Sequence, residues 1–127
     1  MKKTTLILLL LVSSAIAEIK WASSYTTALS QATKEKKNVL VMLSKEGCPA
    51  CEYMEDVVFE EDIVEETISK KFVAVHLDIH TNTLPQGLGY MGTPTFYLLN
   101  AKGEKLKRYD GVANIPTFIG FLTSIKK

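Results

Sequence analysis

Apolar residues gather in short runs along the chain that predict strands. The run at 39–43 is apolar throughout, and 72–79 is too apolar for a surface edge, so both are expected to be buried on two faces. Residues 81–92, interrupted by glycines, are expected to form a loop and a short helix. A third strand is predicted over 95–99, followed by a hairpin turn and a returning strand over 104–109.

Apolar residues at helical spacing predict helices before, between and after these strands. The three helical stretches are 21–37, with Ser23 or Ser24 as a start signal, 49–68 and 115–125. The first is expected to place Trp21 in the core, and acidic residues at 60–62 are expected to interrupt the second. Asn114 is a suitable N-cap for the third. Parallel strands joined by helices and followed by an antiparallel hairpin predict a three-layer α/β/α fold, with a central mixed sheet of four or five strands.

The first seventeen residues have the pattern of a signal peptide and not of folded structure. Two lysines precede an apolar run over 6–12, and Ala15-Ile16-Ala17 is a small-x-small cleavage motif. The run is too short for a spanning stop-transfer helix. We expect cleavage after Ala17, which leaves residues 18–127 as one exported, periplasmic domain. The alternative is a retained N-terminal anchor.

Length, charge and cysteine content narrow the possible functions. The chain has 127 residues and a net charge of +1, which suits one domain and argues against a general nucleic-acid binder. Nine acids and no base occur between Glu46 and Glu66, and we expect them to form a solvated face. Two cysteines permit one bridge at most, so disulfides are not the main source of stability.

The two cysteines form a Cys-X-X-Cys motif, Cys48-Pro49-Ala50-Cys51. A c-type haem site would need histidine after Cys51, where Glu52 stands. A zinc site would need His76 and His80 as further ligands, but their spacing is far from that of a zinc finger. A purely structural bridge over so short a loop would stabilise little. The motif therefore favours redox chemistry without a metal or organic cofactor.

The position of each cysteine indicates its role. Cys48 lies at a strand-to-helix junction, where backbone N–H groups and the helix dipole stabilise a thiolate. Cys51 is one turn further along the helix, within bonding reach and expected to be more shielded. We therefore expect Cys48 to attack and Cys51 to resolve the mixed disulfide. His76 is expected to be an ordinary strand residue without a catalytic role.

With Gly92-Thr93-Pro94-Thr95 about forty residues after the motif, the chain resembles thioredoxin-fold disulfide oxidoreductases. Residues 21–78 are most similar to exported thioredoxin-like proteins and to the C-terminal domain of the membrane thiol reductase DsbD. The resemblance implies a thioredoxin fold over the mature chain. It also implies that Pro94 is cis and packs beside the disulfide, and that Thr93 offers backbone groups to a substrate strand.

Two positions depart from the family's usual pattern. Gly47 replaces the tryptophan that usually precedes the first cysteine, and Met42 replaces a buried aspartate that usually accepts the proton of the second. Glu55 is a candidate substitute, because it lies one helical turn beyond Cys51 and the DsbD-type domain has an acid there. The alternative is a solvated glutamate with no chemical role.

The sequence therefore predicts an exported thiol–disulfide oxidoreductase that uses Cys48 and Cys51. The likeness to DsbD favours the reductase direction, while oxidase and isomerase directions stay open. Its partners would be protein or small thiol and disulfide substrates, and a membrane redox protein supplying electrons. We expect a monomer. A different class, a non-enzymatic binding module or Cu(I)-handling protein, would use the same cysteine pair without exchange chemistry.

Overall fold

The computed structural model describes residues 18–125, so the expected signal peptide lies outside the described residues. The elements in chain order are β1 (Trp21–Ala22), α1 (Tyr25–Glu35), β2 (Asn38–Ser44), α2 (Pro49–Tyr53), the π-helical segment η1 (Met54–Val58), α3 (Asp62–Lys71), β3 (Phe72–Asp78), β4 (Thr95–Leu99), β5 (Lys105–Asp110) and α4 (Ile115–Leu122). Among these residues, no helix is long and apolar enough to cross a membrane.

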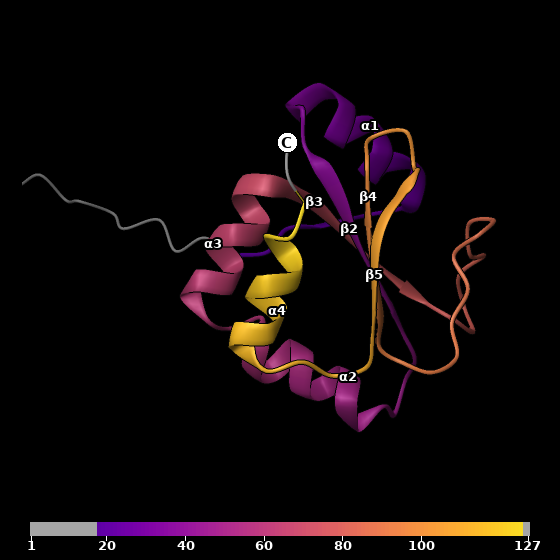
Figure 1. The fold of residues 1–127 in the computed structure, drawn as a ribbon. Coiled ribbons are helices and arrows are strands. Elements are labelled where there is room, and N and C mark those ends of the chain that lie inside the picture. The colour runs from indigo at the N-terminus through magenta and orange to yellow at the C-terminus, as the bar shows by residue number, and fades with distance from the viewer. Residues whose placement is uncertain (1–17, 126–127) are drawn as a thin grey trace, which may run out of the picture.

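The strands form one five-stranded mixed sheet in the order β1-β3-β2-β4-β5. β1 and β2 pair parallel with β3, whereas β4 pairs antiparallel with both β2 and β5. Figure 1 shows α1 on one side of the sheet and α2, α3 and α4 on the other. This arrangement is the predicted three-layer α/β/α thioredoxin fold.

Successive side chains of each strand point to opposite faces of the sheet, and this creates two apolar cores, one on each face. On the α1 face, Val39 and Val41 pack with Ala28 and Ala32. On the opposite face, a cluster of aromatic rings joins the sheet to the helices. Its members are Phe59, Phe96, Phe118 and Phe121. The cysteine pair belongs to this second core, so the site is built into the packed interior.

The N-terminal segment differs from the prediction. Trp21 belongs to the short strand β1 and not to a helix, and it is partly exposed at the edge of the sheet. The helix begins at Tyr25 because the Ser24 side chain accepts a hydrogen bond from the Thr27 backbone N–H, as an N-cap does. The short helix expected within residues 81–92 is also absent, since that segment has only turns, bends and irregular backbone.

The expected interruption of the second helical stretch is confirmed, but it takes a form that periodicity does not indicate. The helix widens into η1 directly after α2, then ends in a turn before α3 begins at Asp62. The π-helical segment buries Met54 and Val58. Glu55, the residue that follows Met54 in this segment, is only partly buried and lies beside the site.

Glu65 contradicts the expectation of a fully solvated acidic face. Its residue exposure is only 8 %. Burial raises the pKa of its carboxyl, and the nearby charges of Glu60, Asp62 and Glu18 raise it further. Because the folded-state pKa lies above the unfolded one, ionised Glu65 opposes folding at neutral pH.

We expect Glu65→Gln to raise the thermal midpoint at pH 7. The gain should shrink as pH falls and vanish below about pH 4, near the ordinary glutamate pKa, because both states are then protonated. Thermal unfolding followed by circular dichroism across pH 4 to 8 measures this. Glu66→Gln is the matched control, because Lys70 lowers the pKa of Glu66 and its removal should bring no gain. A pH-independent effect of Glu65→Gln would contradict the electrostatic account.

Candidate active site

The first cysteine stands where β2 passes into α2. Gly47 precedes it with φ of 71°, in the left-handed region that favours glycine, which gives a backbone reason for glycine at this position. Cys48 is the N-cap of α2, and its Sγ accepts a hydrogen bond from the Cys51 backbone N–H at 3.1 Å. Pro49 occupies the first turn, where a missing N–H costs nothing.

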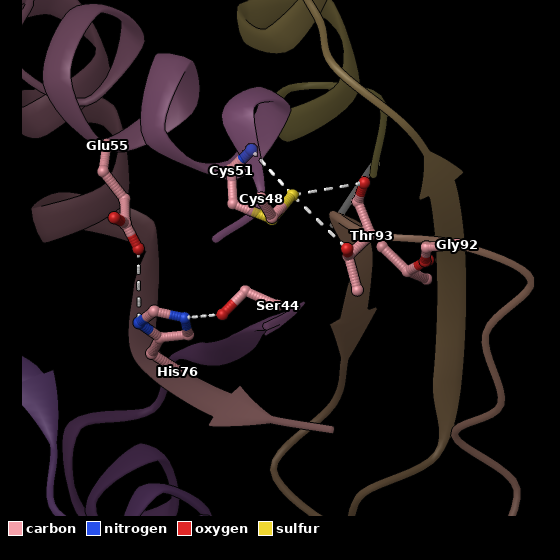
Figure 2. Close-up of a disulfide and its surroundings, with 8 residues drawn as sticks. Ser44, Cys48, Cys51, Glu55, His76, Gly92 and Thr93 are labelled. Atoms are coloured by element: carbon pink, nitrogen blue, oxygen red, sulfur yellow. Dashed lines mark hydrogen bonds and ion pairs between the residues drawn. A yellow bond between two sulfur atoms is a disulfide. The ribbon is translucent and has the colours of Figure 1, made fainter. Parts of the chain in front are cut away.

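Cys48 and Cys51 form a disulfide, with their Cα atoms 5.2 Å apart (Figure 2). The expectation that Cys51 is the more shielded of the two is not met in this oxidised state. Cys48 is 4 % exposed and Cys51 is 3 % exposed, so burial alone does not separate their roles. The difference lies in their neighbours, because polar groups outside α2 reach Cys48.

Those polar groups come from the segment before β4. The Thr93 hydroxyl lies 3.3 Å from the Cys48 Sγ, and the Thr93 carbonyl oxygen lies 3.6 Å from the same sulfur (Figure 2). The Thr93–Pro94 peptide bond is cis, as the resemblance implies, and Pro94 is buried. The structure therefore brings Thr93 to the cysteine that the sequence selects as the attacking one.

A hydroxyl at this distance can donate a hydrogen bond to the sulfur of reduced Cys48. Such a bond favours the thiolate over the thiol, as does the position of Cys48 at a helix start. Among the residues that the structure describes, the Cys51 sulfur has no polar side-chain partner, and it belongs to the apolar core that also includes Met42, Met54 and Val58. The site therefore presents one sulfur supported as an anion and a second sulfur in apolar surroundings.

Within the part of the chain that the structure describes, Glu55 forms no hydrogen bond or ion pair with either cysteine. Its Oε1 lies 3.6 Å from Nδ1 of His76, and Nε2 of that ring is hydrogen-bonded to the Ser44 hydroxyl (Figure 2). The Trp21 ring also packs against His76, with centroids 5.6 Å apart. Sequence reasoning missed Ser44 and His76 at this site. Their signal is one polar residue in each of two apolar runs, since Ser44 directly follows the run at 39–43 and His76 interrupts the run that begins at Phe72.

The sequence comparison identifies the family. Residues 25–126 match the model of the thioredoxin-like domain, so the chain belongs to the thioredoxin-like family. With its Cys-X-X-Cys pair, it has the features of that family's disulfide oxidoreductases. No curated protein matches the chain by sequence. Among the described residues, no group of three or more His, Cys, Asp or Glu side chains is placed to hold a metal ion.

Solved structures share this fold along most of the chain. A thioredoxin from Thermus thermophilus is 26% identical with a TM-score of 0.71, covering 84% of this chain and 86% of its own. DsbH oxidoreductase is 18% identical with a TM-score of 0.66, covering 98% and 93%. The DsbD C-terminal domain of Neisseria meningitidis, in its oxidised form, is 17% identical with a TM-score of 0.62, covering 76% and 87%.

We expect iodoacetamide to alkylate Cys48 of the reduced protein faster than Cys51, and at lower pH, because its thiolate is better stabilised. Mass spectrometry of peptides from timed quenches gives both rates. Cys51→Ser should accumulate mixed disulfides with substrates through Cys48. Equal alkylation rates, or partners trapped by Cys48→Ser instead, would reverse the two roles.

Proposed function

We propose that this protein is an exported protein-disulfide reductase. The observation that supports it most directly is the pairing of Cys48 and Cys51 beside the Thr93 hydroxyl and carbonyl. The reduced Cys48 thiolate attacks one sulfur of a substrate disulfide and displaces the other as a thiolate. Cys51 then attacks Cys48, which restores the internal disulfide and releases the second substrate sulfur.

The surface around the site suits a protein substrate. Met91 is almost fully exposed two residues before Thr93. Val112 is also exposed, and its neighbour Gly111 donates a backbone hydrogen bond to the Pro94 carbonyl. Exposed apolar side chains beside a reactive sulfur give an unfolded or loop segment a surface on which to bind. The Thr93 backbone would align that segment in an extended conformation.

The reductase direction requires a supply of two electrons for each cycle. The resemblance of residues 21–78 to the DsbD C-terminal domain supports a membrane redox partner as the source. The signal-peptide pattern of residues 1–17 supports export to the periplasm, where the protein would meet such a partner. We propose that it acts there as a monomer. An oxidase or an isomerase would use the same site, and the reduction potential of its cysteine pair would differ from that of a reductase.

We expect the Cys48–Cys51 pair to equilibrate with glutathione near the thioredoxin limit, about −270 mV, and far from the DsbA limit of about −120 mV. Equilibration in glutathione buffers, followed by alkylation and mass measurement, gives the potential. Insulin reduction should proceed in parallel and stop in Cys48→Ser. A potential near the DsbA limit would indicate an oxidase. Retention of one equivalent of Cu(I) by the reduced protein, without insulin reduction, would indicate a metal-binding module.

We expect protein recovered from the periplasm to begin at Glu18. Its intact mass should lack residues 1–17 and should include one internal disulfide. A membrane-associated form that still carries Met1 to Ala17 would show instead that the segment is a retained anchor. This measurement is independent of the redox assay, so export and activity can fail separately.

A further inference from the structure

Resolution of the mixed disulfide poses a problem of proton transfer in this core. Cys51 must lose its proton before it can attack Cys48, and burial among apolar side chains disfavours a thiolate. Met42, the side chain that lines this core from the centre of β2, cannot accept a proton. Lys45, Glu46 and Glu52 are the charged residues nearest the motif in sequence, and all are exposed.

A row of polar side chains lies on the sheet face that packs against α2. Ser44 ends β2 at the position two residues after Met42, and alternation places it on the same face. His76 is the direct partner of Met42 on β3. The row continues to Glu55 on η1, so Ser44, His76 and Glu55 come from three elements and are joined by the two contacts drawn in Figure 2, where Ser44 and His76 lie below the disulfide in the view. We call this set the Ser44–His76–Glu55 row.

The hydrogen-bonding chemistry of Ser44, His76 and Glu55 determines the direction in which a proton can pass along the row. The Glu55 Oε1 lies 3.6 Å from Nδ1 of His76, and a nearby carboxylate favours the ring proton on that nitrogen. Nε2 is then the acceptor for the Ser44 hydroxyl proton. The Ser44 oxygen keeps a lone pair with which it can accept a proton from another donor. The Ser44 residue is 4 % exposed, whereas the Glu55 side chain is 40 % exposed.

The outer end of the row opens to water. Glu55 lines a cleft of about 590 Å³ together with Trp21, Asp56 and Glu60. The row therefore runs from a buried hydroxyl through a partly exposed imidazole to a carboxylate in solvent. A proton taken up inside has a route to bulk water that leaves no ionised group stranded in the core.

We propose that His76 accepts the proton of Cys51 during resolution, through the Ser44 hydroxyl, and that Glu55 is a positioning residue that holds and balances the imidazolium. The proposal rests on the exchange chemistry proposed above. The Cys51 thiol gives its proton to the Ser44 oxygen through one intervening water molecule, as Ser44 passes its own proton to Nε2. The Cys51 thiolate then forms a bond to the Cys48 sulfur, and the substrate sulfur leaves as a thiolate. The substrate gains the two electrons, and His76 releases its proton to solvent.

The test separates attack from resolution in one trace. Stopped-flow mixing of reduced protein with 5,5′-dithiobis(2-nitrobenzoate) releases one thionitrobenzoate when Cys48 attacks and a second when Cys51 resolves. The first phase depends on reagent concentration and the second does not. Cys51→Ser, which should abolish the second phase, assigns the phases.

We expect His76→Gln and Ser44→Ala to slow the second phase roughly 10- to 100-fold and to leave the first nearly unchanged. Glutamine can still bond Ser44 through its amide, but it cannot take a proton. Glu55→Gln should slow the second phase less, because the imidazole stays in place. His80→Gln and Glu52→Gln are matched controls at exposed positions outside the row, and both should behave as the parent.

The pH dependence of the second-phase rate separates proton transfer from packing, because a purely structural role of His76 would not change it. In the parent its rate should fall, with an inflection, on acidification, because a protonated ring accepts no proton. The groups facing the ring are Glu55 from η1, Ser44 from β2 and Trp21 from β1. His76→Gln should lose that inflection, and added imidazole should restore part of the rate in His76→Ala.

Three results would overturn the assignment. Parent-like resolution in both His76→Gln and Ser44→Ala would remove the row from the mechanism. Slow resolution in Glu55→Gln with parent-like His76→Gln would make Glu55 the proton acceptor itself. Absence of the first phase in the parent would instead refute the exchange chemistry of Cys48, and the proton route with it.

Discussion

The antiparallel register between β2 and β4 is the constraint on which the site depends. Leu43 near the end of β2 is paired with Thr95 at the start of β4. The chain leaving β2 therefore reaches Cys48 beside the chain entering β4 through Thr93 and Pro94. A slip of one residue would turn every side chain of a strand to the opposite face, and it would separate the Thr93 hydroxyl from the sulfur.

The same packing that fixes this geometry creates a chemical conflict. Both sulfurs lie in the aromatic and aliphatic core that stabilises the fold, yet exchange requires each of them to carry negative charge in turn. Polar groups stand at the margins of that core. Thr93 approaches Cys48 from the segment before β4, and the Ser44–His76–Glu55 row extends from β2 across β3 to η1. In the proposed route, the interior stays apolar while protons pass along the row to its boundary.

Local signals in the sequence predicted those parts of the fold that local chemistry determines. The strand over 95–99 and the Asn114 cap are confirmed without change, because continuous apolar residues and a capping side chain act within a few residues. Trp21 was wrongly placed in a helix, since its helical spacing was outweighed by pairing with β3 and the Ser24 cap. Burial of Glu65 depends on packing of the whole domain and leaves no periodic signal.

The residues of the site also fall into those that local sequence motifs predict and those that only the fold brings together. The Cys-X-X-Cys spacing and Gly92-Thr93-Pro94-Thr95 are contiguous motifs, so their residues could be named from the sequence. The contact of Glu55 with His76 joins a π-helical turn to a strand, and neither the turn nor the parallel register of β2 with β3 is visible in the pattern of residues. A histidine in an apolar strand was therefore interpreted as an ordinary strand residue.

Replacement of a buried acid by Met42 becomes intelligible in these terms. A carboxyl group at that position would lie inside an apolar core, where its ionisation is costly unless partners compensate the lost solvation. Here Met42 packs as a neutral side chain next to His76, and the carboxylate of the row stands at Glu55, where solvent reaches it. The Ser44 hydroxyl and the His76 ring separate the Glu55 carboxyl group from the core. The proposed proton route therefore places its acid at the solvent-exposed end of the row, and the position next to Cys51 in the core is left to a side chain that cannot be charged.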